Sequence, residues 1–165
     1  MKDKIKNYLL KFTVIIKHLE KELKNRFNLE DIPYNEVGRK ISHEGTFVFL
    51  EYTILYKFHG AGCLFKIKGL ELDYNIAPLS DNNIKISPWK FLNFMKSCSN
   101  IEDDINSLDQ RAIFEFLIEF EKAGILSKVP ESRGTFEICE VWLEEKLATS
   151  DSIQAILKSL IADVR

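Results

Sequence analysis

The fold is decided by residues 46–76, which read TFVFLEYTILYKFHGAGCLFKIKGLELDYNI. From 48 to 58 every even position is apolar and the odd side carries Glu51, Thr53 and Lys57, and a similar alternation continues through 63–67 and 70–76. A repeat of two residues is typical of strands with one buried face. We therefore expect a three-stranded antiparallel meander, because glycines supply the backbone freedom that tight turns need. We place its turns at 59–62 and 68–69.

A long helix is predicted before the meander. Its apolar residues recur every three or four positions and lysines fill the other faces, which indicates one apolar stripe. Such a stripe could form a coiled coil, but a helix that faces the core is more common at this length. The stripe consists of Ile5, Leu9, Phe12, Ile16, Leu19, Leu23 and Phe27.

Further helices are predicted after the meander. Ser87 is expected to cap a helix with Pro88 in its first turn, and Trp89 is expected to pack inward with Leu92 and Met95. Residues 107–110 read as a capping box for the next helix, which Gly124 ends. Residues 125–142 are compatible with a small hairpin, and a final helix is expected from about Ser150. The prediction is a single α+β domain over residues 1–165.

The composition restricts the protein class. The chain has 165 residues, 45% hydrophobic residues and three cysteines without a C-x-x-C pair. An odd cysteine count without such a pair argues against a disulfide framework and against a zinc site. We expect no signal peptide and no membrane-spanning run, because the apolar residues near the N-terminus recur periodically. The sequence thus predicts a cytoplasmic protein without a cofactor, metal or membrane contact.

The net charge of -2 hides a strong asymmetry. Residues 1–28 hold eight Lys/Arg and three Asp/Glu, whereas residues 100–121 hold seven acids and one base, Arg111. Either the two segments neutralise each other, or the acidic one contacts a basic partner. The helix before the hairpin is acidic, so we expect no nucleic-acid binding. The predicted partner-binding residues are Glu102, Asp103, Asp104, Asp109, Glu115, Glu119 and Glu121.

The turn at 59–62 offers residues that could carry chemistry. His59, Cys63 and Asp73 are the types needed for a base, a nucleophile and a group that orients the base. Pairing about Gly69 would place Cys63 near Asn75 and Ile76, with Asp73 opposite Phe65. Alternation, however, puts Cys63 on the apolar side, where a thiol is inert. We therefore assign no catalytic residue.

A structural role explains the same turn. His59 would close a strand end by bonding to a backbone carbonyl or to Asp73. Gly60 and Gly62 would supply backbone angles that other residues avoid. A metal site on His59 and Asp73 would need a third ligand, and His43 is the available candidate. The turn is predicted to be structural.

Three stretches carry a family resemblance, namely Tyr56–Cys63, Glu71–Tyr74 and Ser87-Pro88-Trp89. They resemble a bacterial family of unknown function that is marked by an aromatic-x-x-HGxGC turn and a (D/S)PW helix start. The resemblance covers roughly residues 5–97, and Ser87 replaces the Asp of the last element. Such small domains are similar in size and setting to immunity proteins of polymorphic toxin and contact-dependent growth inhibition systems. The resemblance implies His59, Gly60, Gly62, Cys63, Asp73, Pro88 and Trp89 as its structural signature.

The functional hypothesis follows from these observations. We expect a non-catalytic binding protein that neutralises the C-terminal domain of a cognate bacterial toxin. The alternatives are an uncharacterised enzyme that uses His59, Cys63 and Asp73, and a regulatory or scaffold domain.

Overall fold

The computed structural model describes residues 1–26, 40–60, 62–75, 84–130, 132, 134–149 and 151–161. No helix in these ranges is both long and apolar enough to cross a bilayer. The helices are α1 (Lys2–Arg26), α2 (Pro88–Ser97), α3 (Asp103–Asn106), α4 (Gln110–Lys122), α5 (Glu140–Leu147) and α6 (Ile153–Leu160). The strands are β1 (Lys40–Phe49), β2 (Tyr52–Gly60), β3 (Gly62–Ile67), β4 (Leu70–Asn75), β5 (Lys85–Ile86), β6 (Leu126–Lys128) and β7 (Phe136–Ile138).

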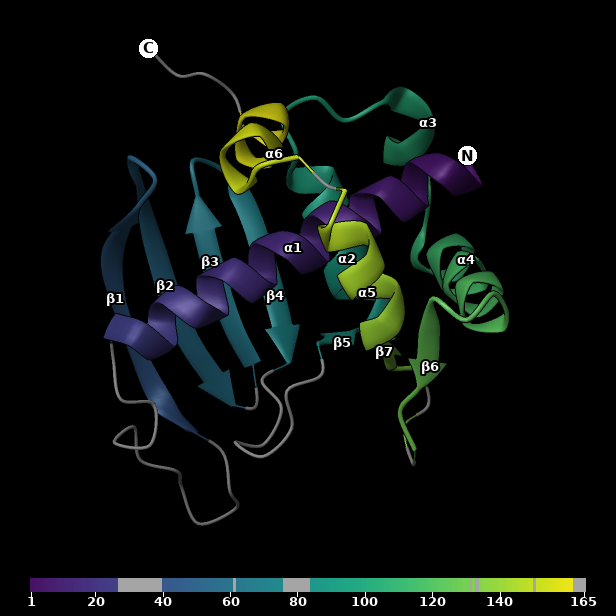
Figure 1. The fold of residues 1–165 in the computed structure, drawn as a ribbon, viewed down its shortest axis with the longest axis horizontal. Coiled ribbons are helices and arrows are strands. Elements are labelled where there is room, and N and C mark those ends of the chain that lie inside the picture. The colour runs from purple at the N-terminus through teal and green to yellow at the C-terminus, as the bar shows by residue number, and fades with distance from the viewer. Residues whose placement is uncertain are drawn as a thin grey trace.

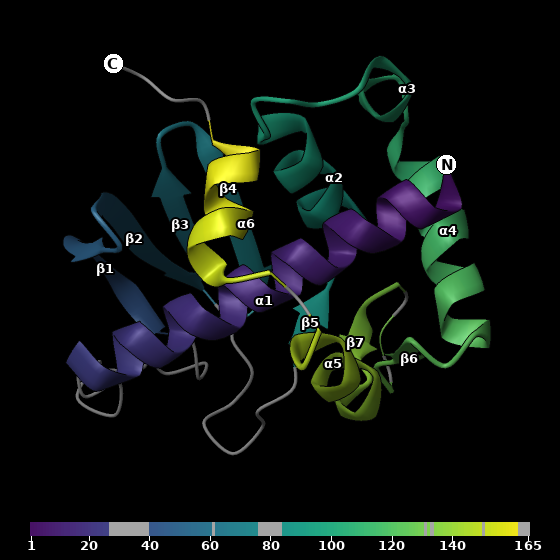
Figure 2. The same ribbon diagram turned by 45° about the horizontal axis from the view of Figure 1, so that its top comes forward.

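The strands form one antiparallel sheet in the order β1-β2-β3-β4-β5-β7-β6. The first four strands follow the chain as a meander, and the β6–β7 hairpin joins them through β5. Helix α1 crosses the meander, and α6 lies on the same side of the sheet (Figures 1 and 2). The structure confirms the predicted α+β class, with its long N-terminal helix, central meander and C-terminal helices.

Helix α1 packs its apolar stripe into the core and does not form a coiled coil within the described chain, so of the two alternatives the core-facing helix is confirmed. The six stripe residues within the helix are at most 1% exposed, while Lys17, Lys21 and Lys24 face outward. The seventh, Phe27, lies outside the described residues. A helix with one apolar stripe is stabilised by burying that stripe, and here the sheet supplies the surface.

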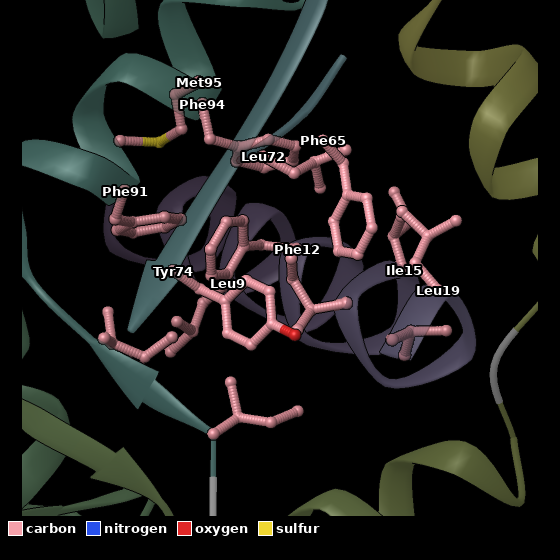
Figure 3. Packing of buried hydrophobic residues seen from close by; sticks show 14 of the residues in the cluster. Leu9, Phe12, Ile15, Leu19, Phe65, Leu72, Tyr74, Phe91, Phe94 and Met95 are labelled. Atoms are coloured by element: carbon pink, nitrogen blue, oxygen red, sulfur yellow. The ribbon is translucent and has the colours of Figure 1, made fainter. Parts of the chain in front are cut away.

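The centre of the core lies where α1 and α2 meet β3 and β4 (Figure 3). The rings of Phe12 and Phe94 have centroids 4.9 Å apart, and Phe65 stacks on Tyr74 at 6.0 Å. Side chains from α1, α2 and the sheet thus interdigitate in one aromatic cluster. The hydroxyl of Tyr74 hydrogen-bonds to Glu20 of α1, and burial raises the pKa of Tyr74 well above its ordinary value.

The expected single strand over 46–58 is wrong, because the chain reverses at Leu50-Glu51. These residues have φ of 48° and 72°, and Phe49 pairs with Tyr52. Positive φ at both central residues is the signature of a type I′ hairpin, which matches strand twist. The reversal changes which positions face inward on β1, so that Val48, expected on the buried side, is 57% exposed.

The predicted register of β3 and β4 is wrong by one residue. Cys63 pairs with Tyr74, and Leu64 stands opposite Asp73. The turn contains two residues, Lys68 and Gly69, with φ of 44° and 90°, so the strands pair about the bond between them. The faces are nevertheless as expected, since Cys63 points into the core and Asp73 away from it.

The predicted capping box at 107–110 is also wrong. Asp109 caps α4, with its carboxylate accepting a 2.8 Å bond from the amide of Ala112. Ser107 instead ends the short helix α3, and its hydroxyl donates to the carbonyl of Asp104. The Asp109 carboxylate thus satisfies one of the amides that the first turn of α4 leaves without an intrahelical partner.

Candidate functional site

His59, near the end of β2, bonds to Asp73 on β4. The distance from Nε2 of His59 to Oδ1 of Asp73 is 3.0 Å, and the side chains are 40% and 19% exposed. Both lie on the face opposite the core, because the neighbouring Cys63–Tyr74 pair occupies the core face. The expected contact between the turn histidine and Asp73 is therefore present, and it leaves the imidazole accessible.

Lys90, which the sequence analysis did not single out, completes the cluster. Its Nζ lies 3.3 Å from the same Asp73 oxygen, and its side chain is only 9% exposed. The ammonium also lies 5.5 Å from the centre of the Trp89 ring. Asp73 thus links the first two stretches that carry the family resemblance to Lys90, which directly follows the third. The sequence pattern of α2 could have indicated that Lys90 is buried, because Lys90 lies four residues before Phe94 and therefore on the same helix face.

Gly62 is required by the close approach of the His59 ring. A Cβ at position 62 would lie 2.9 Å from Cε1 of His59 and 3.1 Å from the backbone oxygen of Tyr74. The expectation that Gly62 supplies a backbone angle that other residues avoid is wrong, because Gly62 is an extended residue at the start of β3 without positive φ. Gly60 ends β2.

Cys63 points into the core and away from His59. The residue is fully buried, and burial, followed by the charge of Asp73, raises the pKa of its thiol. Phe58 and Cys63 pair on the core face, whereas His59 and Gly62 form the next pair on the opposite face. The sheet therefore separates this thiol from the imidazole that would have to activate it.

The start of α2 differs from the prediction at two residues. Ser87 precedes the helix but its side chain makes no capping bond, and within the described residues its buried Oγ has no hydrogen-bond partner. Trp89 is 46% exposed, while Phe91 and Phe94 are fully buried. The inward stripe of this short helix runs through Phe91, Phe94 and Met95, which leaves Trp89 at its edge. Pro88 occupies the first position, as predicted.

Metal binding would need a third ligand beside His59 and Asp73. Across the described ranges no group of three His, Cys, Asp or Glu side chains lies close enough together to hold an ion. The side chain of His43, the candidate ligand from the sequence, lies outside what the structure describes.

Part of the acidic segment is neutralised by α1. The ammonium of Lys4 contacts the carboxylates of Glu102 and Asp104, at 2.5 and 3.2 Å. Hydrogen bonds to both acids raise the pKa of Lys4, and the bond from Lys4 lowers the pKa of Asp104. The expectation that the two segments pair is thus correct for these two acids.

The remaining acids mostly face outward around α4. Glu115 and Glu119 are exposed on the side opposite the buried Ile113, Leu117 and Phe120. Arg111 lies 3.8 Å from Glu115, and both side chains are more than two-thirds exposed, so this contact neutralises little. Asp103 is exposed at the start of α3, and Glu121 is partly buried. We call Asp103, Asp109, Glu115 and Glu119 the acidic face.

The molecule is thus an antiparallel sheet covered by helices, with a polar cluster centred on Asp73 and an acidic face on α3 and α4. The chain belongs to a family described as a domain of unknown function (DUF6896), whose model matches residues 5–144. The match includes the Asp73 cluster and the acidic face, and it ends before α6. Neither a curated protein nor a solved structure matches the chain.

Proposed function

We propose that this protein is a binding protein that uses the acidic face to cover a basic surface of a partner protein. The partner that we propose is the C-terminal domain of a bacterial toxin, which the protein would neutralise in the cytoplasm, as immunity proteins do. The observation that carries the proposal is the exposure of Glu115 and Glu119 on a helix whose other side is fully buried.

The charge distribution supports such a role. Like charges at close spacing on one helix cost a few tenths of a kcal/mol per pair, so a function would explain their presence. Lys4 compensates only Glu102 and Asp104 among the acids of this region. Toxins that cleave nucleic acids need basic grooves, and an acidic surface accelerates association with such a groove.

The burial of Cys63 supports a non-catalytic role over the enzyme alternative. That alternative requires the Cys63 thiol beside the His59 imidazole, and the two side chains point to opposite faces of the sheet. His59 and Asp73 instead form a cluster with Lys90 that ties β2, β4 and α2 together.

The test is charge reversal on α4. The double variant Glu115→Lys/Glu119→Lys should fold like the wild type, since both side chains are exposed. Its association with the proposed cognate toxin domain should be roughly tenfold slower at low salt and depend less on ionic strength. Surface plasmon resonance at several salt concentrations measures both effects.

The matched control is Glu144→Lys/Glu145→Lys on α5, which changes the net charge equally at two exposed positions. Equal slowing by both double variants would show that only net charge matters and would overturn the role of the acidic face. Failure of the wild-type protein to rescue growth when it is co-expressed with that toxin domain would overturn neutralisation.

A further inference from the structure

A hollow of about 440 Å³ lies between the C-terminal half of α1 and the segment formed by β5, β7 and α5. Figures 1 and 2 show α5 close to α1 and next to β7. We call this hollow the α1–α5 pocket. Its size lies within the range of pockets that bind small molecules. It is distinct from the acidic face and from the Asp73 cluster, whose residues do not line it.

The floor of the α1–α5 pocket is apolar and held by backbone bonds. Ile84, Ile138 and Leu143 line it, and each is less than 10% exposed. The amide of Ile138 donates to the carbonyl of Ile84 at 3.0 Å, and the amide of Leu143 donates to Cys139. The floor is therefore preformed, and an apolar ligand would rest on it while covering the aliphatic stems of the rim lysines.

The rim on the side of α1 is basic. Lys17, Lys21 and Lys24 line the pocket at successive turns of the helix. Lys24 pairs with Glu20 at 2.8 Å, and Glu20 also bonds to the buried Tyr74. Among the residues that the structure describes, Lys17 and Lys21 form no ion pair. Two ammonium groups without an ion-pair partner in the described part of the chain thus stand one turn apart beside an apolar floor.

We propose that the α1–α5 pocket binds a small amphipathic anion. A carboxylate or phosphate head would bind Lys17 and Lys21, and an apolar body of several carbons would cover Ile138 and Leu143. A small inorganic anion would leave the floor uncovered, and a neutral apolar molecule would leave both ammonium groups unused. Glu140, which also lines the pocket, repels the head group and sets an upper limit on affinity.

The experiment uses 8-anilinonaphthalene-1-sulfonate, a fluorescent amphipathic anion, with the full chain. One equivalent should bind with increased fluorescence. Octanoate and octyl phosphate should displace it, and their relative strength distinguishes a carboxylate from a phosphate ligand. Octylamine, octanol and inorganic phosphate should each displace it at least about tenfold less well, because each lacks the charge or the apolar body.

Variants connect the binding to the pocket. Lys17→Gln/Lys21→Gln should weaken octanoate binding by about tenfold, and Glu140→Gln should strengthen it by about threefold. The control Lys2→Gln/Lys6→Gln removes two charges from the other end of the same helix and should leave binding unchanged. The proposal is overturned if the first two variants bind like the wild type, if octylamine competes as well as octanoate, or if no probe binds. Displacement by hexaglutamate but not by octanoate would likewise overturn it.

Discussion

The imidazole of His59 lies directly over Gly62, its partner across the β2–β3 turn. A Cβ at position 62 would stand 2.9 Å from Cε1 of that ring and 3.1 Å from the backbone oxygen of Tyr74. The same ring bonds to Asp73, so its position is fixed from two sides. The glycine of the turn is therefore part of the arrangement that directs His59 to Asp73.

This contact predicts that Gly62→Ala destabilises the protein by roughly 1–3 kcal/mol, because either the ring or the strand must move. Urea unfolding followed by circular dichroism measures the loss. In a His59→Ala background the same substitution should cost less, because the ring is gone and only the Tyr74 oxygen remains close. Equal costs in both backgrounds would show that the ring does not impose the glycine.

Asp73 is predicted to matter more for stability than an exposed acid of the same strand. Removing it in Asp73→Ala takes a carboxylate from the buried Lys90, and we expect a cost of about 2–3 kcal/mol. Glu71 on the same strand pairs with Lys66 where both side chains are about half exposed, so Glu71→Ala should cost less than about 1 kcal/mol.

A double variant separates the charge effect from lost packing. Lys90→Met keeps the volume of the side chain and removes the ammonium. Asp73→Ala should therefore lower the free energy of unfolding less when Lys90→Met is already present. Thermal unfolding of the wild type, the two single variants and the double variant measures this difference. Additive losses would show that the two side chains do not depend on each other.

The sequence predicted the elements whose patterns are local. The stripe from Ile5 to Leu23 recurs every turn, and the alternation around Phe65 and Leu72 repeats every second residue, so burial follows from spacing alone. It did not predict the reversal at Leu50-Glu51. Neither residue favours positive φ, and apolar residues alternate without interruption through the turn, so the pattern looked like one long strand.

The candidate site was only partly predictable for a different reason. The bond between His59 and Asp73 could be expected from residue types on neighbouring strands. The place of Lys90 in the cluster depends on how α2 packs beside β4. That packing is set by contacts between buried side chains that are far apart in the sequence, such as Phe12 and Phe94. Periodicity shows which face of a helix is buried, but it does not show which strand that face meets.

The turn at Leu50-Glu51 predicts a stabilising substitution. Leu50→Asn/Glu51→Gly introduces the pair that best tolerates positive φ at both central positions. We expect a gain of about 0.5–1 kcal/mol, because the present residues are strained at φ of 48° and 72°. Thermal unfolding measures the gain. A lower melting temperature would mean that contacts of the Leu50 side chain, which is 36% exposed, outweigh the relief of strain.

The buried thiols predict that stability decreases at alkaline pH. Burial raises the pKa of Cys98 from 9.0 to about 12 and raises that of Cys63 as well. Above pH 9 the unfolded chain loses thiol protons that the folded chain retains, so rising pH favours unfolding. The stability that the two protonated thiols contribute is fully present below pH 9. It is lost progressively toward pH 12, by up to about 1.4 kcal/mol per pH unit for each thiol.

Urea unfolding between pH 8 and 11 measures this slope. The slope should be smaller in Cys98→Ala than in the wild type, because one of the two thiols no longer titrates. Iodoacetamide provides a second measure, since thiolates are the reactive form. Native Cys63 and Cys98 should resist labelling that the partly exposed Cys139 accepts, and all three should react after denaturation. Rapid labelling of native Cys63 would contradict its burial and return it to consideration as a nucleophile.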